Sequence, residues 1–130
     1  MSYLDTAVNT QTVTVATEVA LATNSANDFT GVPANARMII SGVVACAAGT
    51  AGTTASVKVR QGIGAAGAQV GTTITGPVQT AGLAAIVPFT VVDTAPPANG
   101  QYTVTLTFTA NTSSVVTTTV FVLLDSGILE

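Results

Sequence analysis

The sequence predicts an all-β protein, a single-domain antiparallel β-sandwich of seven to eight short strands. Apolar and polar residues alternate with a period of two in several segments, whereas helical periodicity is almost absent. Clusters of Gly, Pro, Asn and Ser separate these segments. With 130 residues, 48% of them hydrophobic, and a mean hydropathy of +0.60, the chain can fold around one core. We expect a sandwich domain over residues 11–125, an N-terminal arm (1–10) and a C-terminal tail (126–130).

Three segments alternate clearly enough to predict strands with two different faces. Residues 102–109 place aromatic and aliphatic side chains on one face and four threonines on the other. Residues 12–15 alternate in the same way, and so do residues 56–60, where Lys58 and Arg60 share the outward face. These two cations either stay solvated or pair with an acidic group on a neighbour.

Other segments are more continuously apolar. Residues 37–44 and 85–92 predict strands that are buried on both sides, or nearly so. Pro88 interrupts the second run, so we expect that strand at a sheet edge or at a bulge. Residues 115–124 predict the last strand, and residues 24–36 predict a polar loop.

A glycine motif follows one predicted strand. Gly62-x-Gly64-x-x-Gly67 has the spacing of a dinucleotide-binding turn, which requires a helix at the third glycine and an acidic residue about 20 positions further on. Residues 68–75 contain β-branched pairs and a glycine, and the next acidic residue is Asp93. The motif therefore predicts a hairpin between residues 54–61 and 68–75, where glycine permits a positive φ.

The charge content excludes several classes of function. Only 7% of the residues are charged, against about 25% in an average soluble protein, and the net charge is −3. So few cations exclude electrostatic binding to nucleic acid and polybasic binding to a membrane surface. No apolar run approaches the roughly 18 residues of a membrane span, and the first residues do not predict a secretory signal.

The available side chains argue against catalysis. The chain has no His and no Trp, which excludes Ser-His-Asp and Cys-His arrangements, and a zinc site would need more ligands than Cys46. Cys46 lies in an apolar run, where a small buried thiol is expected. The carboxylates are scattered singly along the chain. We therefore expect neither an enzyme nor a cofactor.

Two acidic residues have alternative interpretations. Asp28 with Asn24 and Asn27 offers oxygen ligands for calcium, but such a loop also bonds to its own backbone, and the second interpretation is favoured. Asp93 precedes a Pro-rich segment and is interpreted as a turn residue.

The outward faces of the predicted strands are rich in threonine rather than charge. The chain contains 24 threonines, whereas soluble monomers usually cover their surfaces and strand edges with Lys and Glu. We therefore expect a symmetric homo-oligomer, with a cyclic trimer as first choice. The candidate intersubunit contact is the apolar end of the last strand, Val120, Phe121, Val122, Leu123 and Leu124.

Residues 36–124 resemble structural proteins of tailed phages. The matching segments are Ser-Val-Lys-Val-Arg-Gln-Gly (56–62), Gln-Val-Gly (69–71), Val-Pro-Phe-Thr-Val-Val-Asp-Thr-Ala-Pro (87–96), Gly-Gln-Tyr-Thr-Val-Thr-Leu-Thr (100–107) and the final hydrophobic strand. The resemblance is to decoration (cement) proteins with a TNF/C1q-like jelly roll, which trimerise on the outside of an icosahedral head. It covers about two thirds of the chain, and its motifs are generic.

This resemblance implies a function without a catalytic or ligand motif. It implies a virion protein, assembled in the host cytoplasm, that binds the major capsid protein and stabilises the capsid. Residues of the two terminal segments would then contact the capsid as arms, namely Tyr3, Leu4, Ile128 and Leu129. Similar patterns occur in phage fibre and spike proteins, and a carbohydrate-binding adhesin or the shell protein of a small virus are further alternatives.

Overall fold

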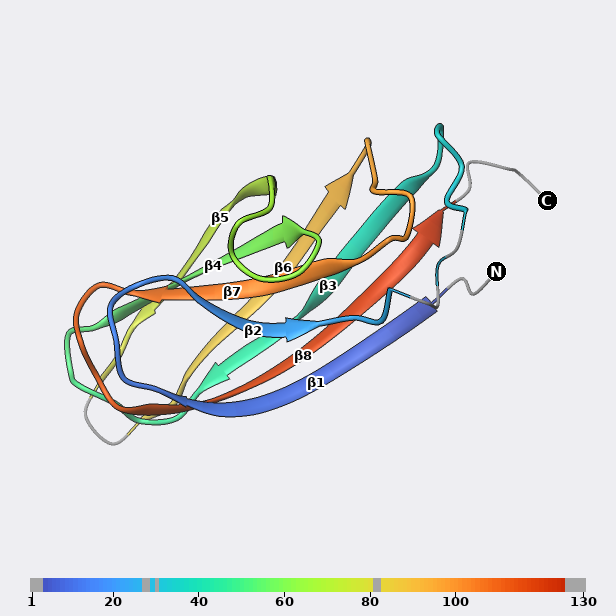
Figure 1. The fold of residues 1–130 in the computed structure, drawn as a ribbon. Helices are drawn as coiled ribbons and strands as arrows, with labels where there is room; N and C mark the ends of the chain where they lie inside the picture. The colour runs from blue at the N-terminus through green and yellow to red at the C-terminus, as the bar shows by residue number, and fades with distance from the viewer. Residues whose placement is uncertain (1–3, 27–28, 30, 81–82, 126–130) are drawn as a thin grey trace.

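Two four-stranded sheets form the molecule. The computed structural model describes residues 4–26, 29, 31–80 and 83–125, and within these ranges every regular element is a β-strand. The strands are β1 (Leu4–Val13), β2 (Val19–Thr23), β3 (Arg37–Cys46), β4 (Thr54–Gln61), β5 (Gln69–Val78), β6 (Ala85–Asp93), β7 (Tyr102–Phe108) and β8 (Ser114–Asp125). Sheet A has the order β1-β8-β3-β6 and sheet B the order β2-β7-β4-β5, with antiparallel neighbours throughout (Figure 1).

The strand order identifies the topology. β1 pairs with β8, β2 with β7, β3 with β6 and β4 with β5, as in one long hairpin whose two arms are rolled up together. Successive pairs of this hairpin fall alternately in sheet A and sheet B. This arrangement is a jelly roll. The predicted all-β sandwich and the predicted hairpin around residues 62–67 are both confirmed.

The core lies between the two sheets and is filled by every second residue. In β6 the buried and exposed positions alternate over the whole strand, because successive side chains point to opposite faces. The largest side chains with almost no exposure come from both sheets and from the loop before β3: Tyr102, Phe29, Phe108, Met38, Ile40 and Leu106.

The structure corrects one expectation about the apolar runs. Residues 37–44 and 85–92 were expected to be buried on both sides, but β3 and β6 bury only their inward residues. Ile86 of β6 is 56% exposed and Val92 is 46% exposed. β6 is an edge strand, as Pro88 predicted. These runs are apolar on both faces even though the chain covers only one of them.

The first described residues are also part of the sandwich. Residues 4–10, which the sequence analysis assigned to the N-terminal arm, lie in β1 and pair with β8 from Leu4, opposite Leu123, onwards. The alternation in β1 is hard to recognise because its inward side chains include Asp5 and Asn9. Tyr3, Ile128 and Leu129 lie outside the described residues.

Two buried threonines give opposite predictions for stability. Thr118 points inward from β8 and is fully buried, and its hydroxyl has no hydrogen-bond partner among the described residues. Thr118→Val keeps the shape and removes a group that costs about 1–3 kcal/mol to bury unpaired, so we expect the free energy of unfolding to rise. Thr103 is equally buried, but its hydroxyl bonds to Gly62 and Gly64, so Thr103→Val should lower that free energy.

Denaturant unfolding of the two variants checks this pair of predictions. A fall in the midpoint for Thr118→Val would show that its hydroxyl contributes a bond that the structure does not contain.

Candidate interaction surface

The chain itself covers the outer face of sheet B over β7, whereas outward residues of β5 such as Thr73 and Thr75 stay exposed. Thr103 and Thr105 face outward from β7, as the alternation predicted, but both are fully buried. The loop that joins β4 to β5 folds back over β7 and covers Thr103 (Figure 1). Thr103 and Thr105 are therefore not available to a partner as part of an interaction surface.

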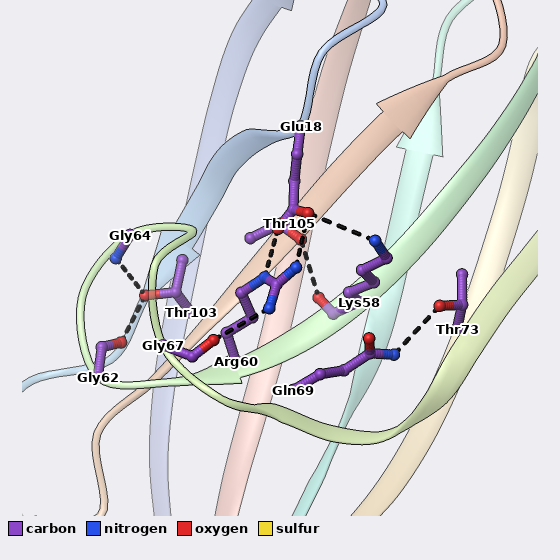
Figure 2. A network of polar contacts seen from close by, with 10 residues as sticks. All are labelled: Glu18, Lys58, Arg60, Gly62, Gly64, Gly67, Gln69, Thr73, Thr103 and Thr105. Atoms are coloured by element: carbon purple, nitrogen blue, oxygen red, sulfur yellow. Dashed lines mark hydrogen bonds and ion pairs between the residues drawn. The ribbon is translucent and has the colours of Figure 1, made fainter.

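Hydrogen bonds hold this loop in place. The Thr103 hydroxyl donates to the Gly62 carbonyl (2.7 Å) and accepts from the Gly64 N–H (3.1 Å), as Figure 2 shows. Arg60 Nη1 donates to the Gly67 carbonyl at 3.0 Å, and the Gly62 N–H donates to the Gln101 carbonyl at 2.8 Å. The loop is thus fixed to β4 and β7 at several points.

Each glycine of the motif has a structural reason. Gly62 and Gly64 have φ values of 80° and 79°, a region that glycine adopts without strain. A Cβ on Gly67 would lie 1.8 Å from the Gln61 carbonyl oxygen, so only glycine fits there. The dinucleotide-like spacing therefore serves a close hairpin turn.

An ionic cluster flanks the loop. Glu18, which immediately precedes β2, accepts two hydrogen bonds from Arg60: Nε to Oε2 at 2.5 Å and Nη2 to Oε1 at 2.8 Å. Lys58 Nζ lies 3.5 Å from Glu18 Oε1, also shown in Figure 2. The two outward cations of β4 therefore pair with an acidic group of their own chain. The sequence carried no signal for this partner, because Glu18 lies 42 residues before Arg60.

The electrostatics of this cluster follow from its geometry. The hydrogen bonds from Arg60 lower the pKa of Glu18 from 4.5 to about 2, against the opposing effect of burial. The same contact raises the pKa of Arg60 above its ordinary value. Three of the chain's nine charged side chains are thus paired at one place.

A second polar cluster joins the two sheets at the end of β6. Asp93 accepts hydrogen bonds from Tyr102 Oη (2.8 Å) and from Gln61 Nε2 (2.7 Å), and its other oxygen accepts from the Ala95 N–H (3.0 Å). The bond from the Ala95 N–H agrees with the prediction that Asp93 is a turn residue. The bonds from Tyr102 and Gln61 were not predicted from the sequence. Burial, followed by the contact with Asp93, raises the pKa of Tyr102. Two members of the cluster are buried, since Asp93 is 6% exposed and Tyr102 1%.

The remaining candidate residues do not converge on a chemical site. Asn24 is buried, and its side chain bonds to the backbone of Gly100 and Tyr102. Asp28 and Asn27, the other two candidate calcium ligands, lie outside the described residues. Cys46 is a buried free thiol, as predicted, and burial raises its pKa to about 11.

The described part of the chain contains no pocket and no group of three His, Cys, Asp or Glu residues that could hold a metal ion. None of its elements is a helix with the length and apolar character needed to cross a membrane.

The outer face of sheet A differs sharply from that of sheet B. Its outward residues are in register across all four strands and form rows. The first row is entirely apolar, and the next rows mix apolar residues with threonine and serine. In the order β1, β8, β3, β6 the four rows are Leu4–Leu123–Ile39–Val92, Thr6–Phe121–Ser41–Thr90, Val8–Thr119–Val43–Pro88 and Thr10–Thr117–Ala45–Ile86.

No residue in these four rows is charged. The Arg37–Asp125 ion pair, at 2.8 Å, lies one row beyond Leu123 at the end of the face. Val8 is 69% exposed and Leu4 52%. Contiguous exposed apolar residues of this kind mark interaction sites in soluble proteins. The outer face of sheet A is therefore the candidate interaction surface.

The predicted intersubunit segment is split by this arrangement. Phe121 and Leu123 lie on the outer face of sheet A and are 42% and 40% exposed. Val120, Val122 and Leu124 point inward and are buried in the core. β8 lies between β1 and β3, so it offers a partner its side chains and not its backbone.

The fold is shared with a virus protein of known structure. A chain from the structure of infectious bursal disease virus Gt strain matches with a TM-score of 0.56 at 12% sequence identity, over 95% of this chain. This chain spans only 33% of that one, and the likeness shows the fold alone. A chain from the cryo-EM structure of the extra small virus VLP of the giant freshwater prawn Macrobrachium rosenbergii matches at 20% identity, over 90% of this chain and 78% of that one, but its TM-score of 0.30 carries no argument. No family model matches the sequence, and no curated protein is similar to it.

The Glu18 cluster predicts a pH dependence of stability. Because the folded-state pKa of Glu18 is about 2, below its ordinary 4.5, its contribution is present above pH 4.5 and is lost as the pH falls toward 2. We expect a loss of no more than about 3 kcal/mol in the free energy of unfolding. Glu18→Gln should lower stability at pH 7 and flatten this part of the pH profile.

The matched control is Asp125→Asn, since the Arg37–Asp125 pair is more exposed and exposed pairs contribute little. Urea unfolding at a series of pH values measures both variants. Equal acid sensitivity in Glu18→Gln and the unsubstituted chain would refute the assignment.

Proposed function

We propose that this protein is a non-enzymatic structural component of a virion. In this proposal it assembles through the outer face of sheet A, as a homotrimer that binds the major capsid protein on the outside of the capsid and stabilises it. The observation that carries the proposal is the outer face of sheet A itself: four rows in register without a charged residue. The likeness in fold to a chain of a virus structure supports it.

The physical argument concerns what this face can bind. Four strands about 4.8 Å apart and four rows about 6.8 Å apart give a flat footprint of roughly 500 Å². This footprint is of the same order as the area of about 800 Å² that each partner contributes to a standard protein interface. Removing threonine and apolar side chains from water costs much less free energy than removing ionised groups. Repetition of such a contact around a symmetric shell multiplies its effect.

The chain ends fit a role in assembly. The first residue of β1 pairs with Leu123, near the end of β8, so the start of β1 and the end of β8 lie side by side in sheet A. We include in the proposal that residues 1–3 and 126–130 contact neighbouring subunits as arms. Leu4, which is exposed at the start of β1, would form the base of the N-terminal arm.

A carbohydrate-binding role is less well supported. Sugar sites on β-sandwiches usually stack the sugar on exposed aromatic rings. Among the described aromatic residues only Phe121 is exposed, and the others are buried in the core: Phe29, Phe89, Phe108 and Tyr102.

Sedimentation tests the proposed function. In lysates of the natural source, the protein should sediment with virus-sized particles and should remain bound in high salt, because contacts without charge are not screened. Phe121→Lys places a charge in the second row of the outer face of sheet A and should release the protein from the particles. Thr75→Lys, at an exposed position of β5 in sheet B, is the matched control and should remain bound.

Two results would contradict this proposal. The first is an unsubstituted protein that sediments only as the free chain. The second is a Phe121→Lys variant that folds and still binds the particles as tightly as Thr75→Lys.

A further inference from the structure

The two sheets have four edge strands, and three of them carry obstacles to further pairing. The edges are β1 and β6 in sheet A and β2 and β5 in sheet B. β6 contains Pro88, which lacks an N–H, and β5 contains Pro77 and two register shifts against β4. β2 has five residues and a register shift of its own. Short strands, bulges and prolines are the usual protections of an edge.

β1 has none of these protections along most of its length. It pairs with β8 over ten residues without a register shift, and it contains no Pro, Gly, Lys or Arg. Its only charged residue is Asp5, close to the start. Figure 1 shows β1 at one edge of sheet A.

Asp5 reveals which backbone groups of β1 face the edge. Its Oδ1 accepts the Thr6 N–H at 2.8 Å, and its Oδ2 accepts the Ser25 N–H at 3.0 Å. The Thr6 N–H therefore points away from β8. Because these directions alternate along a strand, the N–H and C=O groups of Val8, Thr10 and Thr12 face the edge as well.

The edge groups of these three residues are not used within the described ranges. Outside the ladder with β8, no described hydrogen bond reaches the backbone of Val8, Thr10 or Thr12. We call residues 8–12 of β1 the open edge. Asp5 closes the edge on one side of this segment, and the strand ends at Val13 on the other.

We propose that the open edge pairs antiparallel with the open edge of a second copy, around a two-fold axis at Thr10. In this register Val8 lies opposite Thr12 of the partner subunit, and Asn9 lies opposite Gln11 of the partner subunit. Outward residues then face outward residues, as a continuous sheet requires. Opposed β-branched pairs and opposed amides are favourable cross-strand neighbours, and no two charges meet.

A second copy fits the open edge better than a foreign peptide. The segment offers no charge that would select a charged partner, and it is complementary to itself in the register given above. The pairing extends sheet A to eight strands and joins the outer faces of the two copies into one uncharged surface. This inference deepens the proposed function and rests on it, because a two-fold contact at β1 would link the proposed oligomers to one another.

A cysteine at the two-fold axis tests the pairing. Directly opposed, hydrogen-bonded residues have Cα atoms about 5.5 Å apart, a distance that a disulfide spans. Thr10→Cys should therefore form a disulfide-linked dimer on mild oxidation and shift from 12.8 kDa to twice that mass. Cys46 does not compete, because it is fully buried.

Thr117→Cys is the matched control. The Thr117 hydroxyl lies 3.1 Å from that of Thr10 on the same face, but it belongs to the central strand β8. It should stay unlinked in the dimer formed through the edge. An unlinked Thr10→Cys, or a Thr117→Cys that links as fast as Thr10→Cys, would overturn the proposal.

The register is tested by mixing two variants. Val8→Cys mixed with Thr12→Cys should give the mixed disulfide, whereas Thr6→Cys mixed with Thr12→Cys should not; the reverse would overturn the register. Failure here is separable from failure of the proposed function. If Thr10→Cys stays unlinked while Phe121→Lys is still released from particles, edge pairing is wrong and the virion role stands.

Discussion

Strand alternation in a chain with very few charges is the constraint on which the rest of the structure depends. Each sheet of a sandwich buries one face against the other sheet and leaves one face outside. In most soluble proteins Lys and Glu side chains on the outer faces are well hydrated, but here only 7% of the residues carry a charge. The outer faces therefore present threonine and apolar side chains where the chain itself does not cover them.

The two sheets meet this constraint differently. Over β7 and part of β4, sheet B is covered by its own chain: the glycine loop folds over Thr103, and Glu18 pairs with the cations of β4. Sheet A has no such cover within the described residues, and its outward rows remain in register and uncharged from β1 to β6. The β4–β5 loop and Glu18 thus cover β7 and part of β4, whereas the outer face of sheet A is left available for contact with neighbours.

Local sequence signals predicted the features that depend on neighbouring residues. Period-two alternation predicted β4 and β7, the glycines at 62–67 predicted the β4–β5 hairpin, and Pro88 predicted an edge strand. Contacts between distant segments had no such signal, as with the bonds of Glu18 to Arg60 and of Asp93 to Tyr102. The apolar run at 120–124 predicts a single contact surface, because a continuous run does not show which of its residues are buried in the core.

The accessibility of Ser41 tests the central claim most directly. Ser41 lies in the second row on the outer face of sheet A, on the central strand β3. If neighbouring subunits cover this face in the native assembly, a Ser41→Cys thiol should react slowly with maleimide there and rapidly after dissociation into single chains. Thr73→Cys, at an exposed position of β5, should react rapidly in both states. Rapid labelling of Ser41→Cys in the native assembly would contradict the account.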